Sequence, residues 1–122
     1  MSPHRPILVY EQDRSVLASL EFALALEGYQ VLDGTSAGAD PLQAACLIIE
    51  QRHGAGDGLA LLAQLRDSGC HTPAVLLATN PTRSIKARAK AAGTPLVEKP
   101  LLTDDLTRAL RSVIPQEEQA AC

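Results

Sequence analysis

Residues 46–58 have the sequence CLIIEQRHGAGDG, in which an apolar run ends in Glu50 and a glycine-rich loop follows directly. A continuous apolar run of this length is typical of a strand that is covered on both faces of a parallel sheet. A buried strand seldom ends in a charged residue, because a buried charge without a partner costs free energy. The stretch therefore predicts a central strand over residues 46–50 and marks Glu50 as a residue with a partner or a function.

The same kind of apolar run recurs on both sides of this stretch, separated by segments with helical spacing. The runs predict strands over residues 6–10, 29–32, 74–78 and 95–98. Capping residues and glycines at the ends of the helical segments predict helices from Asp13 or Ser15 to Glu27, over 58–68, over 83–92 and from Thr103 to about Ile114. Strands that alternate with helices call for a parallel sheet with helices on both faces. Residues 34–45 have room for about one or two helical turns, so we expect the second helix to be shortened.

Length and composition limit the function classes. The 122 residues predict a single domain over residues 1–122, with a core at 6–114 and a polar tail at 115–122. The net charge of −3 gives no reason to expect nucleic-acid binding. No apolar run is long enough to span a membrane, and there is no room for a signal peptide before the first strand. Three widely spaced cysteines without a CxxC pair favour reduced thiols. We therefore expect a cytoplasmic protein.

Charged and polar side chains follow the predicted strands at their carboxyl ends. These ends carry Glu11 with Gln12, Glu50, Ala78 with Thr79, and Glu98 with Lys99. In a doubly wound parallel sheet the carboxyl ends of the strands meet at one edge, where ligands bind. The sequence therefore predicts a crevice at this edge that receives carboxylates and one ammonium group.

Five stretches carry a resemblance to a known family: ILVYEQD, EGYQVLDG, CLIIEQRHGAGDGLALLAQLR, TPAVLLATN and AAGTPLVEKPL. Over residues 6–114 the chain resembles a response-regulator receiver domain, and the last stretch, with its E-K-P, is the most specific match. The resemblance implies a flavodoxin-like, doubly wound, five-stranded parallel sheet in the order 2-1-3-4-5. It also implies a role in two-component signalling or a phosphorelay, in which a strand-end aspartate receives a phosphoryl group from a histidine kinase.

The functional positions of the family are only partly kept. In receivers an acidic pair holds Mg²⁺, a lysine pairs with the phosphoryl oxygens, a Ser or Thr contacts the phosphate and an aromatic residue rotates in response. The lysine is matched by Lys99. The other positions depart from the pattern: Glu50 at the phosphoacceptor, Glu11 and Gln12 at the acidic pair, Ala78 at the hydroxyl with Thr79 one residue later, and Leu96 at the aromatic. The resemblance thus implies a degenerate phosphorylation site.

These departures weaken the chemistry of phosphoryl transfer. Mg²⁺ is usually anchored by one or two carboxylates, and Gln12 replaces one of them with an amide, so we expect weak or absent Mg²⁺ binding and no other cofactor. Glutamate carries its carboxylate roughly 1.5 Å further out than aspartate. Because phosphoryl transfer depends on positioning and charge neutralisation, we expect neither phosphorylation nor enzyme activity. Glu50 could instead pair with Lys99, either as a mimic of the phosphorylated state or as a remnant without a signalling role.

Two alternatives from other classes stay open. The chain could be a phosphorylation-competent receiver that uses Asp57 or a rearranged Glu50. It could also be a small-ligand binder that uses the crevice around Glu11, Glu50 and Lys99. The loop GAGDG at 54–58 does not match a dinucleotide fingerprint, which is G-x-G-x-x-G after the first strand. We expect Asp57 to cap the following helix, and His53 to be a solvated loop residue.

Two surfaces are candidates for protein contacts. On a helical wheel Val16, Leu20, Ala23 and Leu24 share the face of the first helix that we expect to pack on the sheet, and Phe22 and Leu26 lie on the opposite side. Arg83, Lys86 and Lys90 give the helix at 83–92 a basic face. The partners that the resemblance implies are a histidine kinase, a phosphotransfer protein or another regulator, with a homodimer as a further possibility. We expect no nucleic-acid or membrane partner.

Overall fold

Five parallel strands form one sheet, in the order β2-β1-β3-β6-β7. The computed structural model describes residues 5–53, 56–99 and 105–114. The strands of the sheet are β1 (Ile7–Tyr10), β2 (Val31–Asp33), β3 (Cys46–Glu50), β6 (Ala74–Thr79) and β7 (Leu96–Lys99). Numbered among themselves along the chain, they have the order 2-1-3-4-5, so the predicted fold class is confirmed.

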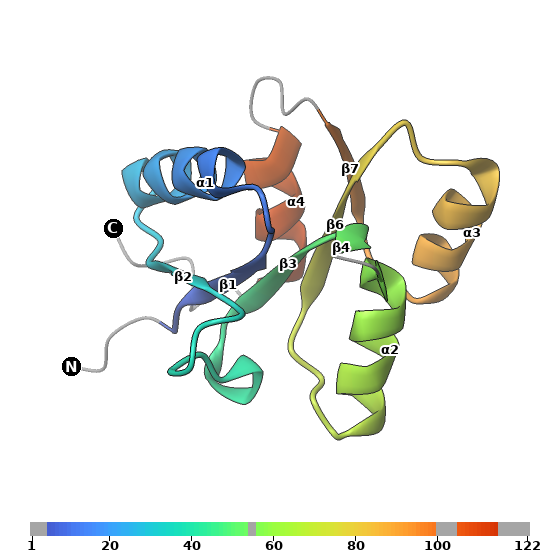
Figure 1. The fold of residues 1–122 in the computed structure, drawn as a ribbon, viewed down its shortest axis with the longest axis horizontal. Coiled ribbons are helices and arrows are strands. Elements are labelled where there is room, and N and C mark those ends of the chain that lie inside the picture. The colour runs from blue at the N-terminus through green and yellow to red at the C-terminus, as the bar shows by residue number, and fades with distance from the viewer. Residues whose placement is uncertain (1–4, 54–55, 100–104, 115–122) are drawn as a thin grey trace.

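Helices cover both faces of this sheet (Figure 1). They are α1 (Arg14–Leu26), α2 (Gly58–Asp67), α3 (Arg83–Ala91) and α4 (Asp105–Val113). α1 and α4 lie on one face, and α2 and α3 lie on the other. The crossover from β2 to β3 contains only the 3-10 helix η1 (Pro41–Gln43), as expected for a shortened second helix. In the part of the chain that the structure describes, no helix is both long and apolar enough to cross a membrane.

The two helical layers enclose two separate cores, because side chains alternate along each strand. The core between the sheet and α1 with α4 takes one set of strand residues: Ile7, Val9, Cys46, Ile48, Val75 and Leu77. The core between the sheet and α2 with α3 takes the intervening set: Leu8, Tyr10, Leu47, Ile49, Ala74 and Leu76. All of these side chains are buried. The central strands β3 and β6 are therefore apolar up to their last residues, Glu50 and Thr79, because both of their faces are covered.

Side-chain caps fix where α1, α2 and α3 begin. Asp13, rather than Ser15, is the N-cap of α1 and accepts hydrogen bonds from the amides of Ser15 and Val16. Asp57 caps α2 through the amide of Ala60, as predicted. Thr82 caps α3 in the same way. The predicted cap at Thr103 and the tail at 115–122 lie outside the described residues.

The sheet-facing side of α1 differs from the prediction at two residues, because Ala23 does not belong to it and Leu17 does. Leu17, Leu20 and Leu24 are buried, whereas Ala23 is exposed. The helix turns its leucines toward the core because they bury more apolar surface than an alanine does. Phe22 and Leu26 are 69% and 72% exposed. Their predicted position on the outer face of α1 is therefore confirmed.

A small antiparallel pair after β3 is absent from the prediction. Here β4 (Arg52–His53) pairs with β5 (Gly56–Asp57). The expectation that His53 belongs to an irregular loop is therefore wrong for its backbone. Strands of two residues leave no periodicity in the sequence, which explains why the pattern did not reveal them. The pair brings Asp57 back beside the end of β3.

Candidate functional site

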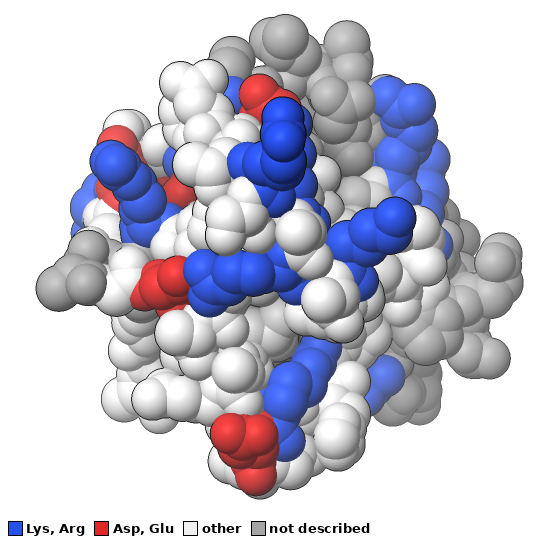
Figure 2. Space-filling view, turned by 90° about the vertical axis from the view of Figure 1, so that its right-hand side faces the viewer, with Lys and Arg blue, Asp and Glu red and all other residues white. Residues whose placement is uncertain are grey.

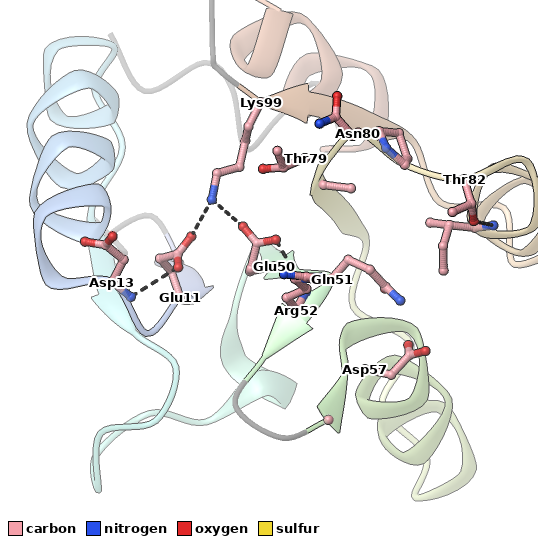
Figure 3. A pocket seen from close by; sticks show the side chains of 14 residues that line it. Glu11, Asp13, Glu50, Gln51, Arg52, Asp57, Thr79, Asn80, Thr82 and Lys99 are labelled. Atoms are coloured by element: carbon pink, nitrogen blue, oxygen red, sulfur yellow. Dashed lines mark hydrogen bonds and ion pairs between the residues drawn. The ribbon is translucent and has the colours of Figure 1, made fainter.

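Three charged side chains meet at the carboxyl edge of the sheet (Figure 3). Lys99 ends β7, Glu50 ends β3 and Glu11 directly follows β1. The Nζ atom of Lys99 lies 2.5 Å from Oε1 of Glu50 and 3.1 Å from Oε1 of Glu11. The two glutamates are buried, and 20% of the Lys99 side chain is exposed. We call this group, made of Glu11, Lys99 and Glu50, the Glu–Lys–Glu triad.

Backbone amides hold the second oxygen of each glutamate. Oε2 of Glu11 accepts a hydrogen bond from the amide of Asp13 at 3.2 Å. Oε2 of Glu50 accepts a longer one, at 3.4 Å, from the amide of Arg52. A buried ion pair is favourable only when its remaining hydrogen-bonding groups are also satisfied. The triad meets this condition, because both oxygens of both carboxylates face a donor.

The alternation of side chains along the strands explains why Glu50 and Lys99 share a face. Glu50 lies two positions beyond Ile48, and Lys99 lies two positions beyond Val97. Both apolar residues belong to the core under α1 and α4, so the charged residues extend the same face at the sheet edge. Because β6 lies between β3 and β7, the two side chains must span an intervening strand. The long lysine and the extra methylene of a glutamate make that contact possible.

Two opposing effects set the pKa of Lys99. Partial burial acts to lower this pKa, since it disfavours the charged ammonium group. Hydrogen bonds to Glu50 and Glu11, together with their negative charges, outweigh burial and raise the pKa above its ordinary value. A raised pKa in the folded state stabilises the protein below the ordinary lysine pKa of about 10.4. That stabilisation is lost as the pH rises through the folded pKa, so it is fully present at neutral pH.

A pocket of about 700 Å³ opens beside the triad. Its wall includes the triad, the loop after β6 and the start of α3. The charged residues that line it are Glu11, Asp13, Glu50, Asp57, Arg52 and Lys99. Carboxylates thus outnumber cations in the lining, and Lys99 is already paired with two of them. Such a lining favours a cation over an anion.

Comparison with solved structures agrees with this architecture. No family model matches the sequence, and no curated protein matches it. A response-regulator receiver domain from Clostridium thermocellum superposes with a TM-score of 0.80 at 18% identity, over 95% of this chain and 98% of that chain. A CheY-like receiver domain from Methanospirillum hungatei gives 0.78 at 18% identity, over 97% and 98%. The chain has the receiver-domain fold. The Vibrio cholerae chemotaxis protein CheY4 shares this fold, with a TM-score of 0.75 at 20% identity over 92% of this chain and all of that chain.

The remaining positions taken from the receiver pattern do not join the triad. Gln12 is exposed and does not line the pocket, in contrast to its neighbour Glu11. Ala78 is buried beside the pocket and offers no hydroxyl. Thr79 is exposed, lies in register with Lys99 and makes no side-chain hydrogen bond with a described residue. Leu96 is half-buried against the core under α2 and α3.

Asp57, the alternative phosphoacceptor, is held by other groups. Its Oδ1 accepts the amide of Ala60, and its Oδ2 lies 3.0 Å from Nη1 of Arg88. Burial acts to raise the pKa of Asp57, but the hydrogen bond from Arg88 and the other hydrogen bonds outweigh it and lower this pKa. The contact between Asp57 and Arg88 joins α2 to α3 and was not predicted. Its partners are 31 positions apart, so no local spacing could reveal it.

Proposed function

We propose that this chain is an atypical receiver module of two-component-type signalling that works without phosphorylation. Glu50 stands in the place of the phosphoacceptor aspartate, and the module acts through protein contacts and not as an enzyme. The observation that carries the proposal is the contact of Lys99 with Glu50 at 2.5 Å. In the receiver pattern the lysine must be available for phosphoryl oxygens, and here a carboxylate of the chain already occupies it.

The metal requirement points in the same direction. Mg²⁺ is usually bound through one or two carboxylates and several waters. Of the two residues at the acidic-pair position, Gln12 is turned to solvent and Glu11 is bound to Lys99 at 3.1 Å. A metal ion would have to displace the ammonium from both triad carboxylates. These residues therefore do not fit a Mg²⁺ site, and the proposal includes weak or absent Mg²⁺ binding.

The triad gives the module one charge arrangement that needs no kinase. Receiver regulation depends on a phosphoryl group that appears and disappears, whereas Glu50 is always present. The pair with Lys99 links the ends of β3 and β7 without a phosphoryl group. We therefore expect contacts with a kinase, a phosphotransfer protein or another regulator to form without a phosphoryl donor. Phe22 and Leu26, exposed on α1, provide one apolar surface for such contacts.

Incubation of the purified chain with acetyl phosphate and Mg²⁺ is expected to give no phosphorylated product. The closed triad and the acidic pocket exclude the reacting anion, and the metal site is weak. Intact-mass spectrometry under acidic quench detects an acyl phosphate directly. The matched control is the double variant Glu50→Asp with Gln12→Asp, which restores the shorter phosphoacceptor and the second carboxylate. Incorporation into the wild-type chain at the level of a phosphorylatable receiver would overturn the proposal.

A small-ligand binder is the second candidate, and the pocket is the observation that favours it. Its volume of about 700 Å³ lies within the usual range for ligand sites. The excess of carboxylates in the lining favours a cationic or amine ligand. If this function is correct, polyamines or amino-acid amides are expected to raise the melting temperature of the chain in a thermal screen. A rise that disappears in Asp13→Asn would place the ligand in the pocket, whereas no rise with any cation removes this candidate.

A further inference from the structure

One sign of charge is concentrated on α3. Its nine residues, RSIKARAKA, include four cations and no acidic residue. Figure 2 shows Lys and Arg side chains gathered on the face of the molecule where α3 lies. Arg83, Lys86 and Lys90 are exposed and form no ion pair within the described part of the chain. Their spacing of three and four residues aligns them along one side of the helix over about 10 Å. We call these three residues the α3 basic stripe.

The stability of α3 does not account for the whole of this stripe. Arg83 is the first residue of the helix, at the end where the helix dipole favours negative charge. Lys86 and Lys90 are four residues apart, a spacing at which like charges repel. A helix that served only as a solvated surface would be more stable with a carboxylate in place of Arg83 or Lys86. Lys90 lies in the last turn, where the dipole favours a cation, so helix stability accounts for Lys90 but not for Arg83 or for the repulsion between Lys86 and Lys90.

α3 also buries fewer of its residues than α1 and α2 do. Ala89 is the one buried residue of α3, and Ile85 is half-buried. Helices with so little buried apolar surface belong to the less stable parts of a fold, from which binding elements are drawn. The fourth cation, Arg88, binds the carboxylate of Asp57 at 3.0 Å. α3 thus already binds one carboxylate that is presented by another element.

We propose that the α3 basic stripe is the docking surface for an acidic segment of a partner protein. This inference deepens the proposed function, because it names a charged surface for the phosphate-independent contacts, in addition to the apolar one on α1. Carboxylates spaced three and four residues apart on a partner helix match the spacing of the stripe and remove its internal repulsion. A nucleic acid fits less well, since three cations over about 10 Å can neutralise only a few phosphates of a duplex.

The test uses the full chain and a fluorescent, alanine-rich peptide with glutamates spaced three and four residues apart. An otherwise identical peptide with glutamine at those positions is the ligand control. By fluorescence anisotropy at low salt, the glutamate peptide is expected to bind at least about tenfold more tightly than the glutamine peptide. The variant Arg83→Gln with Lys86→Gln and Lys90→Gln is expected to lose about tenfold in affinity. Added salt should weaken the wild-type interaction.

A second triple variant controls for net charge. Arg14→Gln with Arg108→Gln and Arg111→Gln removes the same charge from exposed residues of α1 and α4. Circular dichroism checks that both variants fold, and this control is expected to keep the wild-type affinity within about twofold. Equal losses in both variants would overturn the proposal. Tighter binding of duplex DNA than of the glutamate peptide would also overturn it, as would stripe-dependent self-association in sedimentation.

The same titration separates this inference from the proposed function. If the peptide binds only after acetyl phosphate and Mg²⁺ are added, the stripe is the docking surface but the phosphate-independent function is wrong. If the peptide fails to bind under both conditions, the docking proposal is wrong. The proposed function is then still tested by phosphoryl incorporation alone, because the triad does not include any residue of α3.

Discussion

Replacing Lys99 with methionine is expected to lower the free energy of unfolding at pH 7 by about 3 kcal/mol. Methionine keeps most of the aliphatic stem but removes the ammonium, so the buried carboxylates of Glu11 and Glu50 lose their shared cation. Loss of one partner from a buried pair costs about 3–5 kcal/mol, and the 20% exposure of Lys99 places this pair at the lower end. Urea denaturation followed by circular dichroism measures the change.

The control for this variant is Lys86→Met, which removes an exposed lysine from α3. It is expected to change the free energy of unfolding by no more than about 0.5 kcal/mol. The difference in free energy of unfolding between the wild type and Lys99→Met should shrink in acid, because protonation neutralises the unpaired carboxylates. Adding Glu11→Gln and Glu50→Gln to Lys99→Met should recover most of the loss. If Lys99→Met is no less stable than Lys86→Met, water rather than Lys99 compensates the two carboxylates.

The fold followed from the sequence because its strongest signals agree with one another. The strand Ile7–Tyr10 is apolar at every position and Cys46–Glu50 is apolar up to its last residue, and Asp13, Asp57 and Thr82 cap the helices that follow. Each of these signals is local and arises from burial or capping, which are properties that a sequence pattern records directly. The pair of short strands around residues 52–57 was not predicted, because a strand of two residues has no period.

The site was predictable only as far as topology determines it. Parallel strands bring their carboxyl ends to one edge, and this rule placed Glu50 and Lys99 together. The second contact of Lys99, with Glu11, depends on side-chain reach across the end of the sheet. The ion pair of Arg88 with Asp57 depends on the packing of α2 beside α3. Neither distance can be derived from spacing along the chain, since each is fixed by tertiary packing.

Gly58→Ala is expected to lower the free energy of unfolding by about 2–3 kcal/mol. A Cβ atom at this position would lie 2.5 Å from the carbonyl oxygen of Glu50, 2.9 Å from Cγ2 of Ile49 and 3.0 Å from Cα of Gln51. Two of these three neighbours are backbone atoms, which cannot move away by changing a rotamer. The backbone of β3 and the start of α2 must therefore separate. Urea denaturation measures the loss, with Gly38→Ala as the control, because no atom lies within 4 Å of a Cβ there.

The position of Gly58 also links this variant to the triad. The amide of Gly58 donates a hydrogen bond to the carbonyl of Gln51 at 2.7 Å, so a displaced α2 pulls on the segment that follows Glu50. In the wild type that movement weakens the contact between Glu50 and Lys99, whereas in Lys99→Met there is no contact to weaken. Gly58→Ala should therefore cost less in the Lys99→Met background than in the wild type, by about 1 kcal/mol in a double-mutant cycle. Additive losses would mean that the strain is relieved in α2 without moving Glu50.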